Sequence, residues 1–292
     1  MEIAIHLGAH CTDEDLIVQT LHRDEFLRRE AGFTIPAPRR FRPALRHALQ
    51  EDGDDLLPGA SNSLVAELLE GVEGRRLILS YEGFLAARRT AFSQATIYPE
   101  AAVRCARLRD LFPGHEVSFL MGIRNPATLI PAVFEASSEE DFVTFIAGLD
   151  LSALAWSDTV GAIRETCPDV PLTLWCNEDL PLIWPELLRA TAGLPLRGPE
   201  RLEGEFAILE RIMTPEGLTQ LRDHLRVNPP KRPIARRRIV SDFLAEHADS
   251  AEIAPEIDQP GWGAEVIAGL SENYEADVAR LTTRGDISFL AP

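Results

Sequence analysis

Short apolar runs, each long enough for one buried strand, alternate with longer amphipathic segments through the first two thirds of the chain. Strands that are apolar on both faces are typical of parallel sheets covered by helices on both sides. The alternation therefore predicts an α/β fold with a mainly parallel sheet and helices on both faces. The predicted strands are Ile3 to Leu7, Arg76 to Ser80, Val117 to Ile123 and Val170 to Cys176. The predicted helices include a first one marked by Leu16, Leu21 and Leu27, then Phe41 to Gln50, Ser63 to Leu69 and Glu100 to Phe112.

The texture of the sequence changes from about Gly193 onward. Stretches rich in Gly, Pro and charge follow, and the remaining patterns are helical. We expect an α/β core over residues 1–205 and a helical C-terminal extension over 206–292 that packs on it. The predicted C-terminal helices are Pro215 to Val227, Ala235 to His247 and Trp262 to Leu281.

Composition limits the classes of partner. The net charge is −17, with 46 acidic and 29 basic residues, which argues against nucleic acid or an anionic membrane surface as the main partner. The four cysteines form no CxxC pair, so they indicate neither a zinc site nor a disulfide framework. No signal peptide and no run of about 18 apolar residues is apparent, so we expect a cytoplasmic protein.

The segment after the first strand, His6 to Asp15, lies where α/β proteins bind phosphate at a helix N-terminus. It resembles the first motif of bacterial sulfotransferase-like proteins, His-x-Gly-x-His-Lys-Thr-Gly-Thr-Thr, which have a P-loop-like fold. The resemblance implies that the nucleotide PAPS, the sulfuryl donor, or its product 3′,5′-adenosine bisphosphate could bind here. The implied cofactor-binding residues are Gly8, Ala9, His10, Cys11 and Thr12.

Four positions depart from that motif. Cys11 replaces the family's lysine, Asp13 replaces a glycine, and Glu14 and Asp15 replace two hydroxyl residues. One charge pair at 4 Å is worth about 4 kcal/mol at a surface-like dielectric, so we expect these changes to repel a polyanion. In the structural interpretation, Thr12 or Asp13 caps the following helix, and Glu14 and Asp15 occupy its first turn.

Two further strand ends carry parts of the same resemblance. Sulfotransferases bind the 3′-phosphate of PAPS with an Arg at a strand end and a Ser eight residues later. Arg124 matches the first position, and Ala132 stands at the second. Glu82 follows the second predicted strand, where carbohydrate sulfotransferases place a catalytic glutamate, so Glu82 is the candidate general base and His10 a second catalytic candidate. A structural alternative makes Arg124 an ion-pair residue and Glu82 the start of a helix.

A basic run occupies Lys231 to Arg238 in the C-terminal extension. Family members often hold the nucleotide 3′-phosphate with such a segment, so the run could be an anion site. The alternative is a solvated helix face on which Arg238 and Asp242 pair at a spacing of four residues.

The sequence leaves several functions open. His6 and His10 with the carboxylates of residues 13–15 could ligate a metal, but they straddle a turn, and we predict no metal site. The favoured hypothesis is a sulfotransferase-like pseudoenzyme that acts as a binding or interaction module for a small molecule or a protein. The alternatives are an active sulfotransferase, or other activated-group transferase, with an unknown small-molecule or carbohydrate acceptor, and a metal-dependent enzyme.

Overall fold

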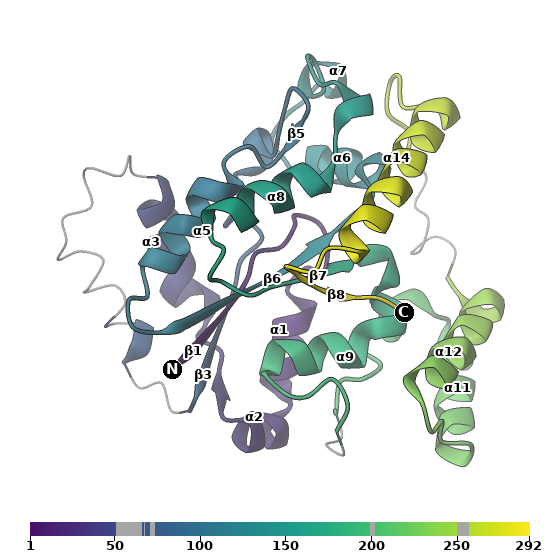
Figure 1. Ribbon diagram of the computed structural model, residues 1–292. Coiled ribbons are helices and arrows are strands. Elements are labelled where there is room, and N and C mark those ends of the chain that lie inside the picture. The colour runs from purple at the N-terminus through teal and green to yellow at the C-terminus, as the bar shows by residue number, and fades with distance from the viewer. Residues whose placement is uncertain (51–65, 67, 71–73, 199–201, 250–256) are drawn as a thin grey trace.

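A six-stranded parallel sheet forms the centre of the molecule (Figure 1). The computed structural model describes residues 1–50, 66, 68–70, 74–198, 202–249 and 257–292. The strand order is β2-β3-β1-β6-β7-β8, and neighbouring strands in this sheet pair in parallel. The strands are β1 (Glu2–His6), β2 (Phe33–Thr34), β3 (Arg76–Ser80), β6 (Glu116–Ile123), β7 (Leu172–Cys176) and β8 (Ser288–Leu290).

Helices cover both faces of the sheet, because alternate strand residues point to opposite sides. Ile3 and Ile5 belong to the larger core cluster, whereas Ala4 and Ile78 belong to a second cluster across the sheet. The larger cluster includes residues of α3 (Pro38–Gln50), α5 (Ala101–Asp110), α6 (Pro126–Glu135), α8 (Trp156–Thr166) and α14 (Ala264–Thr282). The second includes residues of α1 (Leu16–Arg23), α2 (Glu25–Ala31) and α9 (Leu180–Ala192).

The remaining short elements lie in the connections between these helices and strands. They are η1 (Arg88–Thr90), β4 (Phe92–Ser93), β5 (Thr96–Ile97), α7 (Phe142–Phe145), η2 (Leu151–Ala153) and η3 (Asn177–Asp179). Strands β4 and β5 form a separate antiparallel pair. In the part of the chain that the structure describes, no helix combines the length and the apolar character that crossing a membrane requires.

A second, smaller unit of packing lies beside α9. Helices α10 (Leu209–Ile212), α11 (Pro215–Val227) and α12 (Pro233–His247) share a cluster of buried apolar side chains. Figure 1 shows α11 and α12 side by side as a hairpin at the margin of the molecule, away from the strands.

The predicted α/β class and parallel sheet are confirmed, and all four predicted strands are present. The C-terminal segment contains helices at the predicted positions, but it also ends in a strand that was not predicted, because Ser288–Leu290 forms β8 and pairs with β7. Helix α14 packs against α6 and α8, so the end of the chain helps to build the core. A boundary near residue 205 stays a prediction. The helix predicted at Ser63 to Leu69 falls largely outside the described residues.

Candidate functional site

The loop after β1 lies beside the segments that follow β3 and β6, at one edge of the sheet. His6 is in register with Ser80 of β3 and with Leu120 of β6. The Ala9 amide donates to the Gly122 carbonyl, and the Gly122 amide donates to the Gly8 carbonyl, at 2.9 and 2.7 Å. These bonds fix the start of the loop against the end of β6.

Gly8 lies close to the backbone of Glu82, in the segment that follows β3. Its φ is +98°, and a Cβ atom added there would lie 3.1 Å from the Cα of Glu82. A side chain at position 8 would therefore meet both backbone strain and backbone atoms. The glycine brings the loop against the segment that carries Glu82.

Arg124 follows β6 and lies at the same edge of the sheet as the loop after β1. Its Nη1 donates to the carbonyl oxygen of Cys11, and its Nε donates to Thr128 Oγ1 at 3.0 Å. The guanidinium therefore holds loop backbone in this structure. Ala132, where the family has a serine, accepts a weak bond from Cys11 Sγ through its carbonyl at 3.5 Å.

The predicted position of the acidic residues relative to the first helix is wrong. Helix α1 begins at Leu16, and its first turn contains no acidic residue. Cys11, Glu14 and Asp15 all have positive φ values, so the backbone turns repeatedly before the helix starts. The acidic residues thus precede the helix, although Asp13 Oδ2 still accepts the Ile17 amide at 3.1 Å.

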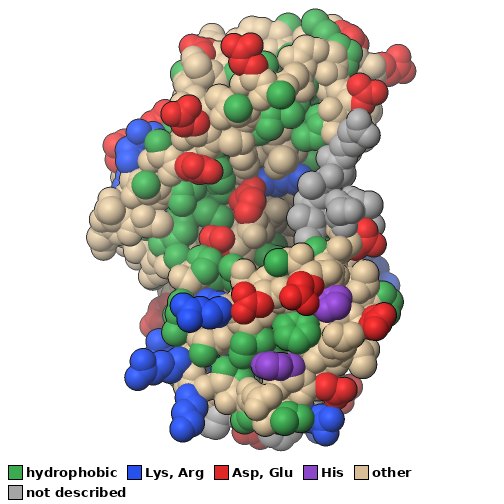
Figure 2. Space-filling model, turned by 90° about the vertical axis from the view of Figure 1, so that its right-hand side faces the viewer, with side chains coloured by type: hydrophobic (Ala, Val, Ile, Leu, Met, Phe, Trp, Pro, Cys, Tyr) green, Lys and Arg blue, Asp and Glu red, His purple; other side chains and the backbone are tan. Residues whose placement is uncertain are grey.

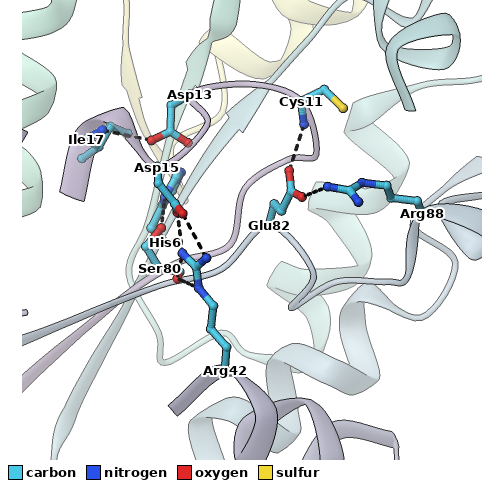
Figure 3. A network of polar contacts seen from close by, with 9 residues as sticks. All are labelled: His6, Cys11, Asp13, Asp15, Ile17, Arg42, Ser80, Glu82 and Arg88. Atoms are coloured by element: carbon cyan, nitrogen blue, oxygen red, sulfur yellow. Dashed lines mark hydrogen bonds and ion pairs between the residues drawn. The ribbon is translucent and has the colours of Figure 1, made fainter. Parts of the chain in front are cut away.

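Each acidic replacement in the loop has a bonding partner within the chain, and Figure 3 shows the partners of Asp13 and Asp15. Burial raises the pKa of the Asp13 carboxyl above its usual value. Asp15 receives two hydrogen bonds from Arg42, one of them at 2.9 Å from Nη1. Glu14 is exposed and lies 3.4 Å from Arg211.

Arg42 holds two parts of the site together. Besides binding Asp15, its Nε and Nη2 donate to the Ser80 carbonyl at 3.0 and 2.8 Å. Its guanidinium also stacks over the Tyr81 ring, 5.3 Å from the centroid. Arg42 thereby links α3, the end of β3 and the start of α1.

Glu82 closes the loop from the other side. Its Oε2 accepts the backbone N–H of Cys11 at 3.3 Å, and its Oε1 pairs with Arg88 (Figure 3). Glu82 lies in a turn and does not begin a helix. In a phosphate-binding loop, a backbone N–H of this kind would face the anion. Here a carboxylate of the same chain occupies that donor.

His10 is buried and neutral. The Tyr98 hydroxyl accepts its backbone N–H at 2.9 Å and lies 2.8 Å from its Nδ1. Desolvation by burial lowers the His10 pKa to about 4, with Arg88 acting in the same direction and Glu82 against it. When the neutral ring bears its proton on Nε2, the Tyr98 hydroxyl can donate to Nδ1.

The Cys11 side chain is a poor replacement for the missing lysine. Burial raises its pKa to about 11, and the charge of Glu82 adds to the shift. A neutral thiol supplies no positive charge for a phosphate. The loop consequently lacks the cation that the resemblance requires at this position.

His6 belongs to a different, fully buried group of polar side chains. Its Nδ1 lies 2.9 Å from Ser80 Oγ, and its ring stacks on Trp175. In the part of the chain that the structure describes, His6 Nε2 has no hydrogen-bond partner, so Asp13 does not complete a Ser-His-Asp triad, and Ser80 is only 4% exposed. Among the described residues, no group of three His, Cys, Asp or Glu side chains could hold a metal ion.

The basic run in α12 is divided between two environments. Arg237 Nη2 pairs with Glu186 of α9 at 3.1 Å, and Arg236 Nη2 pairs with Glu205 at 3.5 Å. Within residues 202–249, no ion pair joins Arg238 to Asp242. Two of the arginines therefore attach α12 to its neighbours, and Arg238 is exposed.

The molecular face that carries α14 and the α11–α12 hairpin is hollowed. Figure 2 shows this hollow between an upper and a lower part, with acidic side chains along its walls and a basic side chain deeper inside.

Glu178 accepts the Asn125 amide at 2.8 Å and the Tyr274 hydroxyl at 2.9 Å. These bonds join the ends of β6 and β7 to α14.

Arg42, Arg88 and Tyr98 were not among the predicted site residues. Arg88 follows β3 closely in sequence, so a search of the segments after strands could have found it. Arg42 lies within α3, and Tyr98 directly follows β5. Neither segment has a sequence pattern that predicts a position at this edge of the sheet. Their role depends on contacts across 27 and 88 residues of sequence.

No protein-family model matches this chain, and neither does any curated protein. The resemblance to sulfotransferases therefore rests on the motifs and their placement at the sheet edge.

Proposed function

We propose that this chain is a sulfotransferase-like protein whose phosphate loop is closed by its own side chains. In this proposal it does not bind PAPS and acts as a binding or interaction module. The observation that supports it most is the occupation of the Cys11 N–H by the Glu82 carboxylate, which Arg88 holds in place.

Closure of the loop by Glu82 opposes nucleotide binding by a different mechanism from charge repulsion. The carboxylates of Glu14, Asp15 and Glu82 each lie beside an arginine, so their field is partly neutralised inside the protein. An incoming phosphate would have to displace Glu82 from Cys11 and Arg88, and it would find no lysine at position 11. Competition for donors therefore opposes nucleotide binding.

A second candidate function is an active transferase with a remodelled donor site. The guanidinium groups of Arg42, Arg88 and Arg124 all contact the loop or Glu82, and such groups could serve an anion if the internal carboxylates moved. Glu82 would then be the general base, with His10 as a neutral hydrogen-bond donor.

A titration with 3′,5′-adenosine bisphosphate separates the two candidates. A ligand at 100 times its dissociation constant stabilises a protein by about 2.7 kcal/mol, which a thermal-shift assay resolves. We expect no shift for the wild type and a clear shift for Cys11→Lys/Glu82→Ala, which supplies the cation and frees the donors. The matched control is Cys11→Lys/Glu178→Ala, which removes a carboxylate from the same sheet edge without opening the loop. Tight binding by the wild type would replace the proposal with the transferase.

A further inference from the structure

The segment that runs from the end of α11 through the turn into the start of α12 is the most strongly basic part of an acidic chain. The thirteen residues from Arg226 to Arg238 contain six cations and no carboxylate, whereas the whole chain has a net charge of −17. Lys231, in this turn, is the only lysine in the sequence. The segment differs in sign from the rest of the protein.

Part of this charge is used inside the molecule. Arg236 and Arg237 pair with Glu205 and Glu186, and Arg226 pairs with Asp223. Lys231, Arg232 and Arg238 are exposed, and they form no ion pair with any residue that the structure describes.

Apolar side chains are exposed in the same place. Val227, the last residue of α11, is 68% exposed, and Ile234, in the first turn of α12, is 58% exposed. Ile234 and Arg238 are four residues apart and therefore neighbours on the helix surface. We call Val227, Lys231, Arg232, Ile234 and Arg238 the hairpin patch.

We propose that the hairpin patch docks a short acidic peptide segment of a partner protein, with apolar side chains among its carboxylates. The inference rests on the proposed function and names the partner chemistry of that interaction module. Carboxylates would meet the three unpaired cations, and the apolar side chains would cover Val227 and Ile234. Figure 2 shows basic side chains along one margin of the lower part of this face.

A short acidic segment fits better than a nucleic acid or a membrane. An extended polyanion would also face the remaining surface, and the net charge of −17 opposes that approach. The patch offers two exposed apolar side chains, which is fewer than an amphipathic helix uses to enter a bilayer. A short peptide can contact the hairpin patch without approaching the acidic remainder of the surface.

The test uses a fluorescein-labelled peptide, (Glu-Leu-Asp-Glu)₃, and its Gln-Leu-Asn-Gln counterpart, followed by fluorescence anisotropy with the full chain. The wild type should bind the acidic peptide and not the neutral one. The charge reversal Lys231→Glu/Arg232→Glu/Arg238→Glu should weaken binding by at least about tenfold, and Val227→Ser/Ile234→Ser by about threefold. The matched control, Arg23→Glu/Arg29→Glu/Arg197→Glu, changes net charge equally at exposed positions and should leave affinity within about twofold.

A second measurement needs no variant. Because Lys231 is the only lysine, acetylation of its amine by an N-hydroxysuccinimide ester can be followed at one site by peptide mass spectrometry. The acidic peptide should protect Lys231 by at least about fivefold, whereas the neutral peptide should not.

Several results would overturn the proposal. They are no binding of the acidic peptide, equal loss of binding in the control variant, and an unprotected Lys231. Patch-dependent binding to vesicles containing phosphatidylserine would replace the peptide with a membrane, and patch-dependent self-association would replace it with a second copy of this chain. Adenosine bisphosphate is titrated into the same samples, so failure of the closed-loop proposal is seen separately from failure of peptide docking.

Discussion

The loop after β1 and the α11–α12 hairpin both concentrate charged side chains, but these side chains have different partners in the two regions. At the loop, Asp15 and Glu82 are bound by Arg42 and Arg88, and the charges close the site. In the hairpin, part of the charge anchors α12, and the rest faces solvent without a partner among the described residues. Formal charge in a sequence therefore does not predict whether a site attracts a ligand, because ion pairs within the protein determine how much of that charge a ligand meets.

The largest expected effect is the pH dependence of stability that His10 causes. The pKa of His10 in the folded protein is about 4, whereas an unperturbed histidine has a pKa of 6.5. As the pH falls from 6.5 to 4, the unfolded chain takes up a proton that the folded chain refuses, so stability falls through this window and levels off below it. The difference corresponds to roughly 3 kcal/mol.

His10→Asn should remove most of that dependence, because an amide oxygen can accept from Tyr98 but does not titrate. Urea unfolding from pH 7 to pH 4 measures it. The raised pKa of Asp13 acts with the opposite sign, and comparing variant with wild type cancels it. Parallel stability curves for the two proteins would contradict a buried, neutral His10.

Arg42→Met should be the next largest effect. It leaves Asp15, whose side chain is 34% exposed, without its partner and frees the Ser80 carbonyl, so we expect a loss of about 2 kcal/mol in the free energy of unfolding. Arg29→Met is the matched control, because Arg29 and Glu25 are 81% and 70% exposed and their pair should contribute less than about 0.5 kcal/mol. Equal effects at the two sites would mean that the loop is not held by Arg42.

Replacing a paired and an exposed arginine of α12 should give a smaller difference in the free energy of unfolding. Arg237→Met breaks a largely buried pair with Glu186, and Arg236 nearby compensates in part, so we expect a loss of about 1.5 kcal/mol. Arg238→Met should change stability by less than about 0.3 kcal/mol, since Arg238 is exposed and has no ion-pair partner among the residues that the structure describes. Chemical denaturation of both variants checks this. A destabilising Arg238→Met would show that the patch is part of the hairpin's own structure.

The smallest effect concerns the reactivity of Cys11. Its pKa of about 11 predicts very slow alkylation by iodoacetamide at pH 8, because little thiolate is present. Glu82→Gln should raise the rate by a few fold, since the charge of Glu82 contributes to the raised pKa. Mass spectrometry of Cys11 peptides gives the rate, and rapid alkylation in the wild type would mean that the loop opens freely.

Local sequence patterns were sufficient for the main strands and for the edge at which the candidate residues meet. Buried strands such as Arg76–Ser80 have an apolar centre, here Leu77 to Leu79, and parallel pairing then places their ends together. Strands β2 and β8 have two and three residues, too few to show a period. They exist because neighbouring strands offer an edge, which is a property of the assembled sheet.

The partners of the site residues were beyond the reach of such patterns. Glu82 could be placed at a strand end, but its contact with the Cys11 amide depends on Gly8 bringing two distant segments together. The acidic loop residues were expected in the first turn of a helix, whereas the positive φ values at Glu14 and Asp15 delay the helix to Leu16. Such a turn is a tertiary feature, fixed by Arg42 and Ile17.

Amide hydrogen exchange at Cys11 tests the closed loop most directly. In the wild type the Cys11 N–H should be protected, and Glu82→Ala should speed its exchange by at least about tenfold while leaving the Asn125 amide unchanged. Glu178→Ala is the reciprocal control, because Glu178 accepts the Asn125 amide and should affect that site alone. A Cys11 amide that exchanges freely in the wild type, or that stays protected without Glu82, would contradict the account.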